Sequence, residues 1–415
     1  MENNCEKKIT FSQSFVLPIE NESLNRSFNR YTLTYYSSGP IKGSITYMTA
    51  GEKVEDEFFL EAGEQVFTCL IKGYLKSEKA DKVISITLTS CTSQEIEFTL
   101  HGISFDVYDV LSNDTFFVEN GRFKVGLRLI WGGGICYIED NQSPIEGLTN
   151  MINQADEGRL VQQSYYGTGG NDEYQPGRFN NQRWVYNPVQ GGDRHANHSR
   201  LIDIKVEKDR VYVKSQPQDW SKDGDITPTY MENTYILTDE YIRVDNRFVD
   251  FSGWKHPYAH QELPAFYTVS YLDTFRHYEG INSWTGDEVT ARPDLPFWGD
   301  PACNKYCCFS VRKENTETWC SWTCDEDDYG IGLYVPNIDL LLAGKHEYNK
   351  SKDPYNAACN YVAPIKALKL VSYEPVEYSY LITCGSVKKI RETFTKYKDF
   401  ATNESLNKNC SCIRK

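Results

Sequence analysis

Apolar and polar residues alternate with a period of two through the first quarter of the chain, and this limits the folds open to it. Ile84, Ile86 and Leu88 are one example, and similar runs recur between residues 31 and 110 without a helical stripe. The period predicts strands with one buried and one solvated face. Short strands in succession, without crossover helices, indicate an antiparallel β-sandwich.

A second unit begins near the turn Asn120-Gly121, where the alternation resumes and long polar loops separate the strands, notably at 140–198 and 273–304. We therefore predict an all-β protein with an accessory β-sandwich over 1–117, a large antiparallel β domain over 118–402 and a mobile polar tail over 403–415. Two short helices are expected, at 146–155 and at 387–399, the second with Ser386 as its N-cap.

Composition excludes several classes of protein. Of 415 residues 40% are hydrophobic, too many for a disordered chain. The net charge of −14 argues against a nucleic-acid partner. No run approaches the roughly 20 apolar residues of a membrane span, so no membrane partner is expected. The N-terminus shows no basic segment followed by an apolar one, which predicts a cytoplasmic protein.

The cysteines indicate thiols rather than disulfides or a metal site. There are 13, an odd number that suits a reducing compartment. The densest group lacks the paired spacing of zinc ligands, so we predict free thiols at Cys303, Cys307, Cys308, Cys320 and Cys324. His195 and His198 beside Asp193 keep a metal site open as the less favoured alternative. Gly132-Gly133-Gly134 does not open a helix, so no nucleotide cofactor is expected.

The segment from 156 to 198 has the composition of a sugar site. Amide, guanidinium and aromatic side chains are interleaved with glycine, and such groups bind vicinal hydroxyls and the apolar face of a pyranose. The alternative is a polar loop held by its own hydrogen bonds, with Asp156 paired to Arg159. The candidate substrate-binding residues here are Arg159, Gln163, Tyr165, Tyr166, Trp184, Asn187, Gln190 and His195.

Three carboxyl groups are candidates for acid–base catalysis. Glu262 lies at the predicted start of a strand, Asp193 lies in the polar segment, and Glu317 precedes an aromatic run. Glycosidic cleavage usually needs two carboxyl groups, about 5–5.5 Å apart for retention or ~6.5–9.5 Å for inversion. The sequence leaves open which two converge. Neighbouring candidates for substrate binding are His260, Gln261, Trp284 and Trp319.

A family resemblance rests on two short runs, Trp131-Gly132-Gly133-Gly134-Ile135 and Asp156-Glu157-Gly158-Arg159. They look like the opening of the galactose-mutarotase-like group. The resemblance implies a β-supersandwich over about residues 118–400 that binds a sugar on its concave face, with a carbohydrate-associated sandwich before it. Mutarotases of this group use a His acid and a Glu base. Glu262 could take the base role, but their His motif is not matched here, which counts against simple aldose epimerisation.

These observations favour a carbohydrate-active enzyme, and most of all a glycoside hydrolase acting on a soluble oligosaccharide or glycoside. A lyase acting on uronides is the first alternative, with Tyr165, Tyr166, His195 and Arg159 as its working residues. A sugar-binding protein without catalysis is the second alternative. An epimerase is the fourth and least favoured hypothesis.

Overall fold

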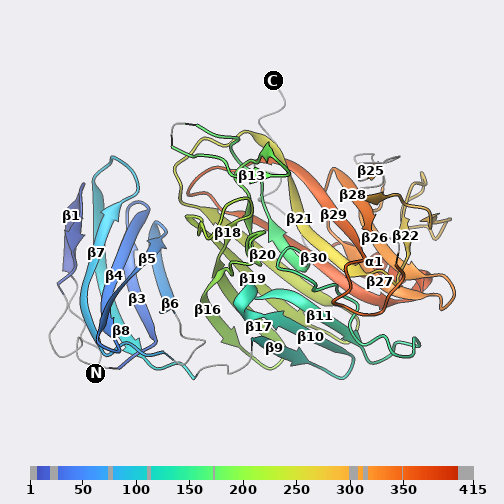
Figure 1. The fold of residues 1–415 in the computed structure, drawn as a ribbon, viewed down its shortest axis with the longest axis horizontal. Coiled ribbons are helices and arrows are strands. Elements are labelled where there is room, and N and C mark those ends of the chain that lie inside the picture. The colour runs from blue at the N-terminus through green and yellow to red at the C-terminus, as the bar shows by residue number, and fades with distance from the viewer. Residues whose placement is uncertain are drawn as a thin grey trace.

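The computed structural model describes residues 7–18, 27–72, 78–109, 114–171, 173–298, 307–311, 316–347 and 349–400. The predicted tail over 403–415 and Cys303 lie outside these residues. Within them the all-β prediction is confirmed, because strands organised in antiparallel sheets dominate the chain (Figure 1).

The first eight strands form two four-stranded antiparallel sheets that pack face to face. Tyr31 and Phe58, one from each sheet, meet edge to face with ring centroids 5.8 Å apart. One sheet has the order β1 (Lys7–Phe11), β8 (Ile96–Asp106), β3 (Arg30–Ser37), β6 (Gly63–Leu70), and the other β2 (Phe15–Val16), β7 (Lys82–Ser90), β4 (Ile41–Thr49), β5 (Glu52–Leu60).

The expected alternation holds in β7 except at one position. Ile86 and Leu88 are fully buried, but Ile84 is 42% exposed. The register of β4 and β7 shifts there, because Ser85 pairs with Thr46 while Val83 pairs with Tyr47. Ile84 is thus the extra residue of a β-bulge, and Val83 occupies the buried position that the sequence predicted for Ile84.

Two larger sheets follow. The first has the order β24 (Phe297–Trp298), β28 (Leu340–His346), β29 (Cys359–Lys369), β21 (Tyr258–Val269), β12 (Val161–Ser164), β11 (Gly134–Asp140), β10 (Phe123–Arg128), β9 (Thr115–Glu119), with β15 (Pro188–Val189), β18 (Gln218–Asp219) and β25 (Cys307–Ser310) attached. The second has the order β16 (Arg200–Val206), β17 (Arg210–Gln216), β19 (Thr229–Leu237), β20 (Ile242–Asp250), β30 (Val376–Gly385), β27 (Tyr329–Tyr334), β26 (Trp319–Cys324), β22 (Thr274–His277), β23 (Thr290–Arg292). A two-stranded hairpin joins β13 (Arg178–Phe179) to β14 (Gln182–Arg183).

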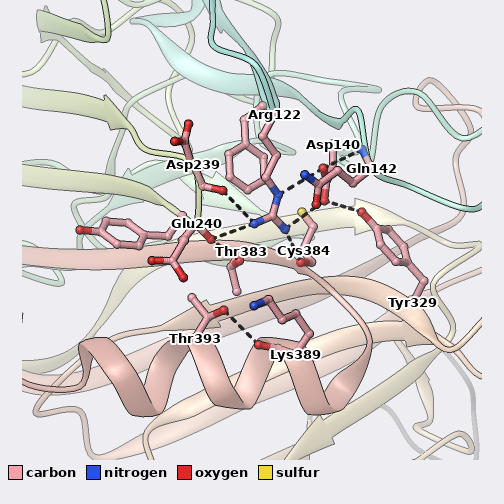
Figure 2. A network of polar contacts seen from close by, with 12 residues as sticks. Arg122, Asp140, Gln142, Asp239, Glu240, Tyr329, Thr383, Cys384, Lys389 and Thr393 are labelled. Carbon is pink, nitrogen blue, oxygen red and sulfur yellow. Dashed lines mark hydrogen bonds and ion pairs between the residues drawn. The ribbon is translucent and has the colours of Figure 1, made fainter.

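These eleven- and nine-stranded sheets also pack face to face. The rings of Tyr165, which follows β12, and Phe248 of β20 stack with centroids 4.0 Å apart. A buried polar network joins the sheets as well (Figure 2). Arg122 forms an ion pair with Asp140 at 3.2 Å and donates to the carbonyl of Cys384 at 2.7 Å, while the hydroxyl of Tyr329 donates to Asp140 at 2.7 Å. Each buried charge therefore has partners, which offsets the cost of removing it from water.

The smaller pair of sheets contacts the larger pair. Arg200 of β16 pairs with the buried Asp56 at 3.1 Å, and the rings of Phe59 and Phe251 stack at 5.1 Å. Strand β9 spans the predicted boundary at 117/118 and pairs with β10 of the eleven-stranded sheet. The division into domains stays a prediction.

One of the two predicted helices is present. Helix α1 (Val387–Tyr397) starts at Ser386, whose hydroxyl accepts the N–H of Lys389. A short 3-10 helix, η2 (Leu129–Trp131), follows β10. In the described part of the chain, no helix combines the length and the apolarity needed to span a membrane.

The helix predicted over 146–155 is wrong. This segment is extended and irregular, and Ile152 forms an isolated bridge with Thr268. The side chain of Asn150 explains this, because its Oδ1 accepts the N–H groups of Ile138 and Ile152 and its Nδ2 donates to the carbonyl of Cys136. The segment is therefore tied to β11 by a side chain that competes with helical hydrogen bonds.

Candidate functional site

A cavity of about 610 Å³ lies over the eleven-stranded sheet. Its floor comes from β12, β21, β29 and β28, and Figure 1 shows the last three side by side in yellow to orange. The loops before and after β12, the loop after β18 and the β13–β14 hairpin supply the wall. The residues used below that line it are Asp156, Gly158, Arg159, Gln162, Ser164, Tyr166, Phe179, Trp184, Asn187, Trp220, Glu262, Tyr267, His346, Cys359 and Tyr361.

A β-bulge in β21 decides that Glu262 faces this cavity. Glu262 pairs with Ile365 of β29, and Phe266 pairs with Val362, so four steps along β21 match three along β29. Partners directly opposite in an antiparallel pair share a face. The extra residue therefore brings Glu262 to the same face as Tyr267, although five positions separate them.

The Glu262 carboxyl group accepts hydrogen bonds from two tyrosine hydroxyls. Tyr166 donates to its Oε1 at 2.9 Å and Tyr361 donates to the same oxygen at 2.8 Å. Burial is the largest influence and raises the pKa of Glu262, while Tyr361, Tyr166 and Ser164 lower it by hydrogen bonding. The net pKa lies above the ordinary value, which makes Glu262 a stronger base than an exposed carboxylate.

The residue next to Glu262 fixes the position of Tyr166. Gln261 is fully buried and faces the opposite way along β21. Its Oε1 accepts the N–H of Tyr166 at 2.6 Å and its Nε2 donates to the carbonyl of Tyr166 at 2.9 Å. One side of β21 thus carries the carboxyl group, and the other side holds the main chain that brings a donor to it.

Arg159 and His346 meet at another part of the cavity. Arg159 forms an ion pair with Asp156 at 3.0 Å and donates to the carbonyl of Ala357 at 2.6 Å. The ring Nδ1 of His346 also lies 3.0 Å from this carbonyl. A carbonyl can only accept, so Nδ1 carries the hydrogen and Nε2 remains available to a ligand. Burial raises the pKa of the nearby Cys359 thiol to about 12, which keeps it protonated.

The structure brings five of the predicted site residues together. Arg159, Tyr166, Trp184, Asn187 and Glu262 all line the cavity. Asn187 joins two of its parts, since its Oδ1 accepts the indole N–H of Trp184 at 3.0 Å and its Nδ2 lies 3.3 Å from the hydroxyl of Ser164. Ser164 is the register partner of Glu262.

Three other predicted residues lie on the opposite face, between the two large sheets. Gln163 donates to Asn233 at 3.1 Å, Gln190 donates to the same oxygen at 2.8 Å, and Tyr165 donates to Gln163 at 2.8 Å. All three are fully buried. Side chains alternate along β12, so its cavity-facing residues are Gln162 and Ser164.

The other two candidate carboxyl groups lie elsewhere. Asp193 is buried in its own loop, where it accepts the main-chain N–H groups of His195, Asn197 and Gly224. His195 is exposed beside it. In this arrangement Asp193 orders a turn and does not line the cavity.

Glu317 lies against helix α1, away from Glu262. It is fully buried, receives Arg391 at 2.6 and 3.0 Å, and also accepts the indole N–H of Trp319 and the main-chain N–H of Trp284. A separate cavity lined by Trp284 and Arg391 lies at this helix. His260 is exposed on β21. The three candidate carboxyl groups therefore do not converge.

Sequence reasoning missed Tyr361, His346, Trp220 and Phe179. Tyr361 lies 99 positions from Glu262, and only the pairing of β21 with β29 brings them together. The sequence carried a weak signal for Phe179, since Asn180-Asn181 is a turn dipeptide that predicts a hairpin. Nothing in the local sequence around His346 distinguishes it from an ordinary strand end.

The cysteines of the predicted thiol group that the structure describes are free. Cys320 and Cys324 are buried on β26, Cys307 is half-buried and Cys308 is exposed. Across the described ranges, no group of three or more His, Cys, Asp or Glu side chains is placed to hold a metal ion.

The chain matches no family model and no curated protein. Solved structures resemble it in part. A galactose mutarotase related enzyme from Lactobacillus acidophilus is 12% identical, with 66% of this chain and 97% of that one covered and a TM-score of 0.43. A galactose mutarotase-like protein from Lactobacillus casei is also 12% identical, with 65% and 100% covered and a TM-score of 0.41.

A GH36 alpha-galactosidase from Geobacillus stearothermophilus is 10% identical, with 66% of this chain and 40% of that one covered and a TM-score of 0.39. TM-scores below 0.5 describe a loose similarity, so these matches assign no activity to the chain. In its strand arrangement, the chain bears a weak resemblance to galactose-mutarotase-like proteins.

Proposed function

We propose that this protein is a carbohydrate-active enzyme that binds a reducing sugar in the cavity and interconverts its anomers, with Glu262 as the general base. One observation carries the proposal: a carboxyl group with a raised pKa faces a cavity walled by aromatic rings and is held there by two tyrosine hydroxyls. A base needs a defined position and a pKa nearer the working pH, and this arrangement supplies both.

The reaction needs one base and one acid. The Glu262 carboxylate takes the proton of the anomeric hydroxyl, the C1–O1 bond becomes a carbonyl, and the bond from C1 to the ring oxygen breaks as that oxygen receives a proton. Rotation about C1–C2 and closure on the other face give the other anomer. His346 is the candidate acid, because the carbonyl of Ala357 engages its Nδ1 and leaves Nε2 as the ring nitrogen that would carry the second hydrogen and give it to the ring oxygen.

Glycoside hydrolysis is the second candidate, and Asp156 is the observation that favours it. Asp156 and Glu262 are the two described carboxyl groups that line the cavity. Hydrolysis usually needs two such groups. Asp156 is paired to Arg159 at 3.0 Å, which fixes the position of its carboxyl group for the base or nucleophile role, with Glu262 as the acid.

Polarimetry tests the proposal. Freshly dissolved α-D-glucose and α-D-galactose are followed with purified protein, and 4-nitrophenyl glycosides are assayed in parallel for hydrolysis. We expect faster relaxation of optical rotation, and Glu262→Gln to slow it by about 10²–10⁴-fold, the usual contribution of general base catalysis. Glu119→Gln, on the exposed edge strand β9, is the matched control and should keep full activity.

Two outcomes would count against this function. Full activity in Glu262→Gln would remove Glu262 from the mechanism. Release of nitrophenol that depends on both Asp156 and Glu262, without faster mutarotation, would replace the proposed function with hydrolysis.

A further inference from the structure

We propose that the cavity holds a second sugar ring beside the one at Glu262, on a subsite formed by Phe179, Trp184 and Trp220. The substrate class is then a reducing disaccharide or longer oligosaccharide rather than a free monosaccharide. This inference rests on the proposed function and adds to it the identity of the ligand.

Two of the three rings come from the β13–β14 hairpin. Phe179 and Trp184 meet edge to face with centroids 5.2 Å apart. The tip residues Asn180 and Asn181 have φ values of 48° and 62°, typical of a tight two-residue turn, so the hairpin is short and defined. Arg194 contacts the hairpin at two points. Its guanidinium lies 5.6 Å from the centre of the Phe179 ring, and its Nη1 donates to the carbonyl of Arg178 at 3.0 Å.

The third ring approaches from β18. The main-chain N–H of Trp220 donates to the carbonyl of Asn187 at 2.9 Å. Its indole lies against Gly158, where an added Cβ would fall 2.7 Å from the ring carbon Cη2. A side chain at this position would have to displace the indole, so Gly158 leaves the ring its present place beside Arg159.

All three rings line the cavity and remain partly exposed in it, although each is large and apolar enough to be buried in a core. Grouped aromatic surface of this kind marks a binding site. Of the two tyrosines that hold Glu262, Tyr361 lies on the sheet floor and Tyr166 lies just after β12, whereas these three rings lie farther along the loop wall. Asn187 connects the two parts, through Trp184 on one side and Ser164 on the other.

The size of the cavity fits two rings. Its volume of about 610 Å³ falls within the range of about 300–1,000 Å³ of pockets that enclose drug-sized ligands, more than one pyranose fills. A sugar presents an apolar face of C–H groups and a rim of hydroxyls. Aromatic wall and polar floor together match that pattern, with the reducing ring at Glu262 and the second ring against the aromatic wall.

Calorimetry with defined sugars tests the subsite. Lactose, maltose and cellobiose are compared with glucose and galactose, and octyl glucoside serves as a probe with an alkyl chain in place of the second ring. We expect at least one disaccharide to bind about tenfold more tightly than either of its component sugars, and more tightly than octyl glucoside. Phe179→Ala should weaken that disaccharide about three- to tenfold, as loss of one aromatic contact predicts, and monosaccharides less than about twofold.

The control and a second variant keep the test independent of folding. Phe117→Ala removes a Phe that is 44% exposed on β9, outside the cavity, and should leave every affinity unchanged. Trp184→Phe keeps an aromatic ring but removes the indole, so it should reduce the fluorescence change caused by the disaccharide while the protein stays folded.

Failure of the subsite and failure of the proposed function look different. Equal affinity for mono- and disaccharides, or an equal loss of both in Phe179→Ala, overturns the subsite even if Glu262→Gln abolishes turnover. Full turnover in Glu262→Gln with an intact disaccharide preference overturns the proposed function and leaves the subsite standing. Tighter binding of octyl glucoside than of any disaccharide assigns the rings to an alkyl chain, and absence of binding by every probe overturns both.

Discussion

The side-chain amide of Gln261 forms two hydrogen bonds with the main chain of Tyr166. Its oxygen accepts the N–H of Tyr166 at 2.6 Å, and its nitrogen donates to the carbonyl of Tyr166 at 2.9 Å. Because the hydroxyl of Tyr166 donates to Glu262 at 2.9 Å, two consecutive residues of β21 act on one tyrosine from opposite faces of the strand. The position of the donor and the position of the acceptor are therefore set by the same strand.

Gln261→Leu should disturb the site without touching the cavity. It leaves the N–H and the carbonyl of Tyr166 without their partner, at a cost of about 1–3 kcal/mol in the free energy of unfolding. The hydroxyl of Tyr166 then no longer favours the ionised form of Glu262, so the pKa of Glu262 rises and the acidic limb of the pH–rate profile moves to higher pH. Denaturant unfolding and the pH profile are measured together; lower stability with an unmoved profile would reduce Gln261 to a purely structural residue.

Tyr361→Phe tests the same carboxyl group directly. The hydroxyl of Tyr361 stabilises the carboxylate, and hydrogen bonds to charged groups contribute about 1.5–3 kcal/mol, so its loss should raise the pKa of Glu262 further. Since the base must be ionised, kcat/KM should fall at acidic pH and recover at higher pH. The control is Tyr137→Phe, which removes a similar Tyr–Glu contact, to Glu139, outside the cavity; a matching shift in that variant would refute the explanation.

Glu317→Ala should affect stability and leave catalysis alone. Its carboxylate is fully buried with Arg391, and removal leaves a buried cation without its main partner, which usually costs about 3–5 kcal/mol. Activity per folded molecule should stay near normal, because Glu317 lies outside the cavity of Glu262. The exposed Glu392→Ala on the same helix should cost about 0–1 kcal/mol. A folded Glu317→Ala protein without activity would return Glu317 to the list of catalytic residues.

His277 should make stability depend on pH. It is buried against Phe275 and Phe309 and accepts the Nε–H of Arg292 at 3.4 Å, which requires a neutral ring. Burial, the largest cause, lowers the pKa of His277 from 6.5 to about 4, with Glu279 opposing and Arg292 adding to the shift. The unfolded chain therefore binds the proton first, and the stability due to neutral His277 is present above pH 6.5 and lost as the pH falls toward 4.

The measurement for this linkage is the free energy of unfolding between pH 4 and 7. In His277→Gln the decline across that window should be smaller than in the wild type. His260→Gln, on the exposed part of β21, should follow the wild-type curve. Parallel curves for all three proteins would show that the decline comes from other groups.

Much of the fold could be predicted because the periodicity of a strand depends on residues close together in the sequence. The alternation at Ile96, Phe98 and Leu100 of β8 and the N-cap at Ser386 depend on neighbours within a few residues, and both predictions are confirmed. The failures have a common cause, a single residue that overrides the local pattern. A β-bulge turns the side chain of Ile84 toward solvent. Hydrogen bonds of Asn150 hold its segment against β11 and prevent the helix predicted there.

The site could be predicted only in part, because a strand has two faces and the sequence does not show which face lines the cavity and which packs in the interior. In the run from Gln162 to Tyr166, alternate residues belong to the cavity and to the interior. Residue types suited to sugars occur on both faces, since Gln163 and Tyr165 serve a buried network with the same chemistry. Tyr361 and His346 enter the cavity through strand pairing over long sequence separations, which no local motif records.

The bulge in β21 means that the position of Glu262 is governed by the number of residues in the strand as well as by their identity. Deleting one residue between Glu262 and Phe266 would restore even pairing with β29 and turn the carboxyl group toward the packed interior. Glu262 itself would be unchanged, yet the cavity would lose its base and the core would receive a charge. The length of β21 at this point therefore matters to the site as much as the identity of Glu262, because one residue fewer turns the carboxyl group away from the cavity.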